Sequence, residues 1–295
     1  MRRVSLEQLN AADKWSFVAD LADVFEQSPW AAEGVLRQRP FTTLKSLYDA
    51  MTREVSAADA AQQLALIAAH PDLAGKAARQ GSLSADSQQE QTSSGLDRLS
   101  DEEFESFHRL NTEYRNKFGF PFIICVRRHS KDSILQQFAN RLQHGRDAEI
   151  AAALSEIFRI AALRLDQRVI GPDKLQVHGQ MSTHVLDMYS GRPASGVSVE
   201  LFELSDVGNR RLVAQARTNL DGRTDEPLIH QRPIPIGSYE LRFAVEEYFR
   251  QQSVALASPA FLGLVPVRFA VAEPEGRYHV PLLVTPWAYS TYRGS

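Results

Sequence analysis

The sequence predicts two domains of different fold classes, an all-α helical domain followed by an all-β sandwich. Up to about residue 170 the chain is rich in Ala, Leu, Gln and charged residues and carries repeated helix-start signals. Helical periodicity then stops at Ile170, Gly171-Pro172 terminates it, and a strand-like pattern begins by Val177. At 295 residues the chain suits two domains. We expect them at residues 1–170 and 177–295, with a linker at 171–176.

Helix signals recur along the first domain. Ser5 is followed three residues later by Gln8, Ser28 precedes Pro29, and Asp101-Glu102-Glu103 opens a long periodic run that ends at Gly119. The expected helices span residues 5–9, 13–27, 29–38, 42–54, 57–69, 101–118, 132–144 and 147–169.

Three segments of this domain contain residues that could do chemistry. Pro71 disfavours helical geometry at His70, so the imidazole should project from a helix end. Ser87 lies three residues before Glu90 and four before Gln91, which places the three on one face if the segment is helical. Each pattern alone is more often structural, as a helix cap or a solvated polar turn.

The last helix of this domain carries an apolar stripe that ends in a charge. Leu154, Ile157 and Ala161 recur at helical spacing, and Arg164 continues the stripe. A guanidinium in that position must find a buried acceptor or open into a cavity, although an arginine that reaches solvent is the commoner case.

Taken together, the motifs of this half resemble one family. HPDLAGK, S-x-x-EQ with GLDRL after it, NTEYRNKFGFPFIICVR at 111–127 and ALSEIFRIAALRL at 153–165 are similar to 2-oxo-4-hydroxy-4-carboxy-5-ureidoimidazoline (OHCU) decarboxylases. The resemblance implies that His70 and Glu90 are the catalytic pair, with His70 oriented by Glu90. It also implies a set of substrate-binding residues: Pro71, Ser87, Gln91, Phe122, Ile123 and Arg164.

Decarboxylation leaves an electron pair that needs a sink. The sequence has no Schiff-base context, thiamine motif or metal-ligand cluster such as H-E-x-x-H, so we expect no cofactor and no metal. The imidazoline ring of the substrate then serves as the sink through its C=N and C=O groups. The protein has to hold the carboxylate out of conjugation, relay protons and protonate one face of the carbanion-like centre.

The second domain carries residues suited to opening a ring at an amide-like carbonyl. That reaction needs an activated water, a proton relay and a cation facing the oxygen that gains charge. His184 and His279 supply imidazoles, and the hairpin signal Asp221-Gly222 places Arg223 just past a tight turn. A nearby guanidinium favours the neutral imidazoles that accept protons, although a strand histidine is more often structural than catalytic.

This half resembles the 5-hydroxyisourate hydrolases, enzymatic relatives of transthyretin. The matching stretches are GQMSTHVLDMYSGRPASGVSVEL at 179–201, TNLDGRT at 218–224 and YHVPLLVTPWAYSTYRGS at 278–295. The resemblance implies an active site of His184, Arg223, His279 and Ser295, supported by Tyr292 and Arg293. It also implies a homotetramer in which the terminal serine lines a site shared across a subunit interface, since a polar tail frays unless packing holds it.

Composition restricts the remaining possibilities. A net charge of −3 gives no electrostatic case for nucleic acid, and no stretch approaches a membrane span. The single Cys125 excludes an intramolecular disulfide and favours a reducing compartment. Neither end shows an organelle signal, so we expect a cytoplasmic protein.

The two resemblances join into one reading. The hydrolase family converts 5-hydroxyisourate into OHCU, and the decarboxylase family converts OHCU into (S)-allantoin, so we expect a bifunctional enzyme of urate degradation. Three alternatives remain: a small-ligand carrier in the second domain, a helical interaction scaffold in the first, or a metal-dependent cyclic amidase.

Overall fold

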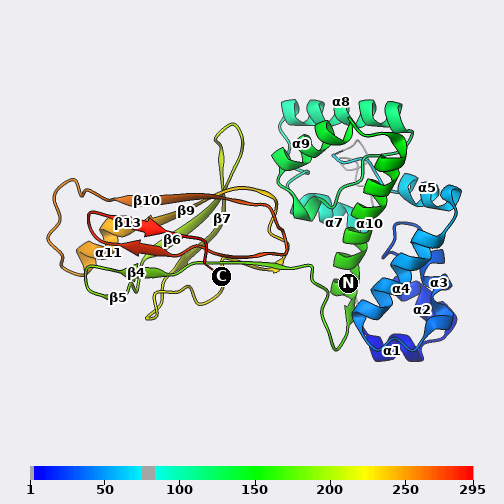
Figure 1. Ribbon diagram of the computed structural model, residues 1–295, viewed down its shortest axis with the longest axis horizontal. Coiled ribbons are helices and arrows are strands. Elements are labelled where there is room, and N and C mark those ends of the chain that lie inside the picture. The colour runs from blue at the N-terminus through cyan, green and yellow to red at the C-terminus, as the bar shows by residue number, and fades with distance from the viewer. Residues whose placement is uncertain (1–2, 75–83, 295) are drawn as a thin grey trace. The chain divides into compact units, whose positions relative to one another are not determined.

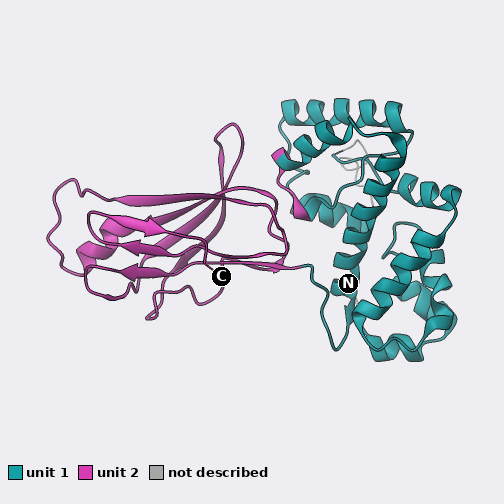
Figure 2. Cartoon of the chain, in the orientation of Figure 1, with its two compact units in different colours: residues 1–127, 133–177 teal, residues 128–132, 178–295 magenta. Residues whose placement is uncertain are grey.

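The computed structural model describes residues 3–74 and 84–294, and these fold into a helical unit and a β unit (Figure 1). The first compact unit comprises residues 1–127 and 133–177, and the second comprises residues 128–132 and 178–295 (Figure 2). Both predicted fold classes are therefore confirmed. The boundary at residues 171–176 stays a prediction.

The helical unit is organised along one long helix, α10 (Arg146–Arg168), which contacts α4 and α5 (Figure 1). The other helices are α1 (Leu6–Ala11), α2 (Lys14–Leu21), α3 (Trp30–Gly34), α4 (Leu44–Ala57), α5 (Ala60–Ala68), α7 (Ala85–Ser93), α8 (Asp101–Phe118) and α9 (Lys131–Arg141), with short 3-10 turns η1 (Leu36–Gln38) and η2 (Val126–Arg128). The strands β1 (Val4–Ser5) and β2 (Val169–Ile170) pair in parallel.

The predicted helix signals act as expected in this unit. Ser5 and Gln8 form a reciprocal capping box, and α8 begins behind a second box between Ser100 and Glu103. Gly119 ends α8 in the left-handed conformation, with φ +81°. Three helix predictions need correction. The expected helix over 13–27 ends at Leu21, and the one expected over 29–38 divides into α3 and the 3-10 turn η1. Residues 85–93, for which a helix was only conditional, form α7.

The early end of α2 has a physical cause. After Leu21 the chain leaves the helix, so that the Asp23 carbonyl and the Glu26 carboxylate both accept hydrogen bonds from Arg164 Nη1, at 3.0 and 2.8 Å. In a continued helix the Asp23 carbonyl would point along the axis toward the amide four residues later, so leaving the helix lets it face the Arg164 guanidinium. Tertiary contacts thus override the local helical pattern.

The core of the helical unit is strongly aromatic. Phe122 stacks on Phe138 with ring centroids 3.7 Å apart, and Tyr114 meets Phe122 edge to face at 5.1 Å. All three side chains are buried. The FGFPFI segment therefore runs through the core, which fixes the backbone around Ile123 against the end of the pocket described below.

The β unit contains a four-stranded sheet in the order β10-β9-β6-β7, a three-stranded sheet β11-β3-β8, and a four-stranded sheet β13-β12-β4-β5. The strand bounds are β3 (Gly179–Ser182), β4 (Val185–Asp187), β5 (Arg192–Pro193), β6 (Ser198–Leu204), β7 (Arg210–Arg217), β8 (Ile229–Arg232), β9 (Gly237–Ala244), β10 (Leu264–Val271), β11 (Arg277–His279), β12 (Leu282–Val284) and β13 (Tyr289–Thr291). Their inward side chains form one apolar core. One short helix, α11 (Val245–Gln251), was not predicted.

Strand pairing brings distant sequence segments together in the β unit. β3 pairs in parallel with β11, so that Ser182 lies opposite His279, and β4 pairs in parallel with β12. Such parallel pairs join residues nearly 100 positions apart. The two predicted histidines therefore meet at adjoining strand ends.

Candidate active sites

A pocket with polar and apolar walls lies between α5, α7 and α10 in the helical unit. Its volume is about 350 Å³. The residues lining it are His70, Pro71, Leu73, Ser87, Glu90, Gln91, Phe122, Ile123, Ile124, Val126, Ile160 and Arg164. Every residue that the sequence assigned to the first site lines this one pocket.

His70 lies directly after α5, as the Pro71 signal predicted. Its Nδ1 is 2.9 Å from the Leu66 carbonyl oxygen, which only accepts, so Nδ1 carries the hydrogen and Nε2 the lone pair. Among the described residues nothing hydrogen-bonds Nε2, although that atom is buried. Burial lowers the pKa of His70 to about 4, with the Arg164 charge acting in the same direction. The pocket therefore presents a neutral imidazole with an available acceptor.

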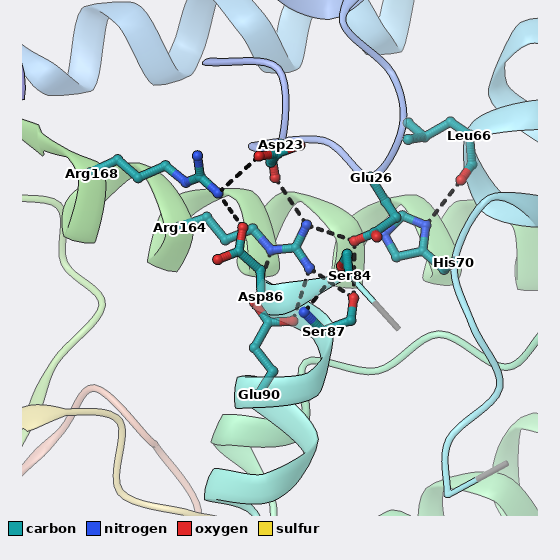
Figure 3. A network of polar contacts seen from close by, with 10 residues as sticks. All are labelled: Asp23, Glu26, Leu66, His70, Ser84, Asp86, Ser87, Glu90, Arg164 and Arg168. Carbon is teal, nitrogen blue, oxygen red and sulfur yellow. Dashed lines mark hydrogen bonds and ion pairs between the residues drawn. The ribbon is translucent and has the colours of Figure 1, made fainter. Parts of the chain in front are cut away.

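The predicted orientation of His70 by Glu90 differs from the contacts observed. The ring is held by the carbonyl of Leu66, one turn earlier, and Glu90 forms a bidentate pair with Arg164 through distances of 2.8 and 3.0 Å (Figure 3). The reason is the stronger attraction of a carboxylate for a guanidinium than for a neutral imidazole.

Arg164 is the electrostatic centre of this pocket (Figure 3). Its Nε and Nη2 donate to Glu90, Nη1 donates to Glu26 and to the Asp23 carbonyl, and Nη2 also donates to Ser87 Oγ at 3.3 Å. These bonds use all the N–H groups of a guanidinium. Burial alone would lower the pKa of Arg164, but the hydrogen bonds and charges of Glu90 and Glu26 raise it. The side chain is 3% exposed and permanently charged.

Sequence reasoning missed Glu26, which belongs to this network. Its carboxylate accepts from Arg164 Nη1 at 2.8 Å and from Ser87 Oγ at 3.0 Å. Burial would raise the pKa of Glu26, but the Arg164 charge and hydrogen bonds hold it below its ordinary value. Glu26 lies in the turn after α2, where no periodicity marks it. The one signal in the sequence for burial of Glu26 is that it lies among apolar residues in VFEQSPW.

Gln91 fixes the chain on the other side of the pocket. Its Oε1 accepts from the Ala74 amide at 2.9 Å, and its amide nitrogen donates to the Asp72 carbonyl at 3.4 Å. The Leu73 carbonyl accepts from Asn111 Nδ2 on α8 at 2.8 Å. The HPDLA part of the motif is therefore tied to α7 and α8, while Gly75 and Lys76 lie outside the described residues.

The second site is a pair of imidazoles in the β unit. His184 Nδ1 is 3.1 Å from His279 Nε2, and the rings lie nearly parallel with centroids 5.4 Å apart. Burial and the Arg223 charge lower the pKa of both histidines below 6.5. His279 Nδ1 in turn lies 2.9 Å from Ser182 Oγ. Both rings are accordingly neutral near pH 7.

Gly222 brings Arg223 to this site. A side chain at residue 222 would meet the Val185 carbonyl oxygen at 2.4 Å, and φ is +72°, so the turn requires glycine. The Gly222 carbonyl accepts from the Val185 amide at 2.8 Å, and Arg223 forms a β-bridge with His184. The hairpin signal Asp221-Gly222 therefore correctly predicted where Arg223 lies.

The C-terminal tail reaches the same site. The Gly294 amide donates to the His279 carbonyl at 2.8 Å, and a side chain at residue 294 would meet His279 Cδ2 at 2.7 Å. The Arg293 guanidinium stacks over the Tyr278 ring at 4.8 Å, while Tyr292 is exposed. Ser295, predicted to be catalytic, lies outside the described residues. Its place at a shared interface stays a prediction.

Ser182 is the second residue that sequence reasoning missed. It precedes His184 by two positions, and side chains two apart on an extended strand share a face. The sequence STHVLD shows this spacing. The sequence does not show the hydrogen bond from Ser182 to His279, because that bond depends on the pairing of β3 with β11.

The folds and sites define a two-domain protein with an acid–base pocket in a helical domain and an imidazole site in a β-sandwich. A family model described as OHCU decarboxylase matches residues 10–166, and one described as HIUase/Transthyretin family matches residues 181–294. The chain therefore belongs to the OHCU decarboxylase family and carries a domain of the HIUase/transthyretin family behind it.

Individual relatives agree with these matches. The 2-oxo-4-hydroxy-4-carboxy-5-ureidoimidazoline decarboxylase of Halalkalicoccus jeotgali is 42% identical over 176 residues, 60% of this chain and 98% of that protein. The 5-hydroxyisourate hydrolase of Deinococcus radiodurans is 51% identical over 118 residues, 40% of this chain and 98% of that protein. A crystal structure described as (S)-allantoin synthase is 32% identical, covers 99% of this chain and 100% of its own, and has a TM-score of 0.53.

Proposed function

We propose that this chain carries out two consecutive steps of urate degradation. The β domain hydrolyses 5-hydroxyisourate to OHCU, and the helical domain decarboxylates OHCU to (S)-allantoin. The observation that carries the proposal is the convergence of His70, Glu90 and Arg164 on one pocket, in a chain that also places His184 against His279.

In the helical domain, His70 Nε2 accepts a proton from the substrate and later returns one to the carbon that loses CO₂. The neutral imidazole and its fixed Nδ1–H suit this role. His70 is the one imidazole among the described residues that line the pocket, so protons reach the substrate from the side of this ring, which accounts for a single enantiomer. The substrate ring accepts the electron pair that the broken C–C bond leaves behind.

Protein groups accept hydrogen bonds from all the N–H groups of Arg164. Arg164 can therefore bind the carboxylate or ring oxygens of the substrate only if one of these protein acceptors moves away. Glu90 lines the pocket with its side chain 16% exposed, whereas the Glu26 side chain is 4% exposed and lies behind it. Displacing Glu26 would leave a buried carboxylate unpaired. Glu90 is therefore the partner that gives way to the substrate.

In the β domain, the neutral imidazole pair takes a proton from water while Arg223 faces the carbonyl oxygen that gains charge. We assign Ser295 to the catalytic residues of this site, with Tyr292 and Arg293 as substrate-binding supports. The Gly294–His279 bond supports the tail's part in this assignment.

We further propose a homotetramer formed through the β domain. Aromatic side chains gather on β13 and the turn before it, where Trp287 is 57% and Tyr289 45% exposed. β13 is an edge of its sheet within the described chain, and an edge strand presents unpaired N–H and C=O groups that a second copy of the chain could pair with. Native mass spectrometry measures the subunit number, and a monomer would contradict the assignment.

No helix within residues 3–74 and 84–294 is long and apolar enough to cross a membrane. A cytoplasmic location stays an expectation, supported by the single cysteine.

The pH dependence of ring opening tests the hydrolase half of the proposal. Burial and the Arg223 charge lower the pKa of both histidines, so the neutral pair persists to lower pH than an ordinary histidine pair would. Protonation at still lower pH removes the acceptor and stops catalysis. We expect kcat/KM for 5-hydroxyisourate to be level between about pH 7 and 8 and to fall on the acid side, with a midpoint below that of an ordinary histidine. Stopped-flow absorbance, corrected for spontaneous hydrolysis, measures it. No acceleration at any pH would overturn the proposed function.

A further inference from the structure

Three polar groups form a continuous chain in the β domain. Ser182 Oγ lies 2.9 Å from His279 Nδ1, and His279 Nε2 lies 3.1 Å from His184 Nδ1. The near-parallel rings, 13° apart, hold this order along strands β3 and β11. The third group, Ser182, belongs to no catalytic assignment made above.

The positions of the protons along this series of hydrogen bonds depend on one another. A single hydrogen lies between the two ring nitrogens that are at hydrogen-bond distance, and each neutral imidazole has one N–H hydrogen in all. If His279 Nε2 carries the shared hydrogen, His279 Nδ1 accepts from the Ser182 hydroxyl and His184 Nε2 is protonated. If His184 Nδ1 carries it, His279 Nδ1 donates to Ser182 Oγ and His184 Nε2 has the lone pair. Only the second arrangement lets His184 take a proton from water.

We propose that Ser182 is a positioning residue of the hydrolase site, whose hydroxyl holds the His279 ring and accepts the His279 Nδ1 hydrogen when His184 Nε2 acts as the base. The inference rests on the proposed hydrolase function and adds the residue that pairs with His279 in the reactive tautomer. This role matches that of a group orienting the base in other acid–base sites.

The surrounding backbone fixes Ser182 for this role. Its carbonyl accepts from the Val280 amide at 3.0 Å, and its register partner on β11 is His279 itself. On the opposite side, the Gly294 amide holds the His279 carbonyl. The serine hydroxyl and the imidazole are therefore both anchored through their own main chains.

The chemical step balances with these groups. His184 Nε2 takes a proton from water as the water oxygen bonds to the substrate carbonyl carbon, and Arg223 faces the oxygen that becomes negative. Collapse of this intermediate breaks the C–N bond. The proton held on the histidine pair then passes to the leaving nitrogen, which restores the starting tautomers.

The test compares Ser182→Ala with Ser182→Thr in the full chain. Alanine leaves the His279 Nδ1–H of the reactive tautomer without an acceptor and the ring without its side-chain anchor, so kcat for ring opening should fall about tenfold, the order expected for one lost hydrogen bond. KM should change less than about twofold, since Ser182 does not touch substrate. Threonine keeps the hydroxyl on a strand and should restore kcat. Circular dichroism in the far ultraviolet checks that the β domain is folded, and decarboxylation of supplied OHCU by the same preparation controls for the amount of active protein.

Two results would overturn the inference. One is a kcat for Ser182→Ala within about twofold of wild type, and the other is equal loss in the alanine and threonine variants with decarboxylation intact. The variant His279→Ala separates this failure from failure of the proposed function. If ring opening survives in His279→Ala, the hydrolase site itself is wrongly assigned.

Discussion

Replacing His70 by alanine is expected to make OHCU accumulate and then decay slowly to racemic allantoin, while ring opening of 5-hydroxyisourate stays near wild type. His70 is the one imidazole among the described residues that line the pocket, and its buried Nε2 is an available acceptor, so no other imidazole can take over proton delivery. A general base contributes about 10²–10⁴-fold, which makes the defect plain against the spontaneous reaction. Circular dichroism of the allantoin formed measures the enantiomeric excess.

His108→Ala is the matched control for this variant. His108 lies on α8 in the same domain, is exposed and stacks on Phe104. It should leave both rate and enantiomeric purity unchanged. If His70→Ala still gives pure (S)-allantoin at the normal rate, His70 is a structural residue of the helix end.

Replacing Arg223 by alanine is expected to impair the other activity, ring opening, and to leave decarboxylation intact. Loss of the cation that faces the carbonyl oxygen should slow enzymatic ring opening by about 10²–10³-fold, the usual cost of removing one such group. Externally supplied OHCU should still be decarboxylated, because the two sites share no residue and distant sites behave independently. Absorbance of 5-hydroxyisourate and of OHCU, followed separately, measures both rates.

Arg217→Ala provides the control for charge alone. Arg217 ends β7 in the same domain and pairs with Glu247 at 3.1 Å in an exposed position. Exposed pairs contribute little to stability, so this variant should resemble wild type in both assays. Unimpaired ring opening in Arg223→Ala would remove Arg223 from the active site.

The sequence predicted much of this molecule because local signals and tertiary structure agree in most places. Ser5, Ser100 and Gly119 bound helices with the side-chain and backbone conformations that these residue types favour. Gly222 occupies a turn that admits no side chain, and that turn brings Arg223 to His184. In each case a short stretch of sequence contains the physical reason for its own structure.

What the sequence did not predict depends on contacts between distant segments. The helix expected to continue to residue 27 ends at Leu21, because Arg164, more than 130 positions later, binds the turn that contains Glu26. The same guanidinium draws Glu90 away from the role of orienting His70. Ser182 acquires a partner only through strand pairing. Local patterns contain no information about these pairs.

The central claim is that one chain performs both steps and controls the configuration of the product. The most direct measurement generates 5-hydroxyisourate with urate oxidase in the presence of the wild-type protein and records circular dichroism of the allantoin as it forms. The account predicts (S)-allantoin without accumulation of OHCU, at a rate well above the spontaneous one. Racemic allantoin that appears at the spontaneous rate would contradict it.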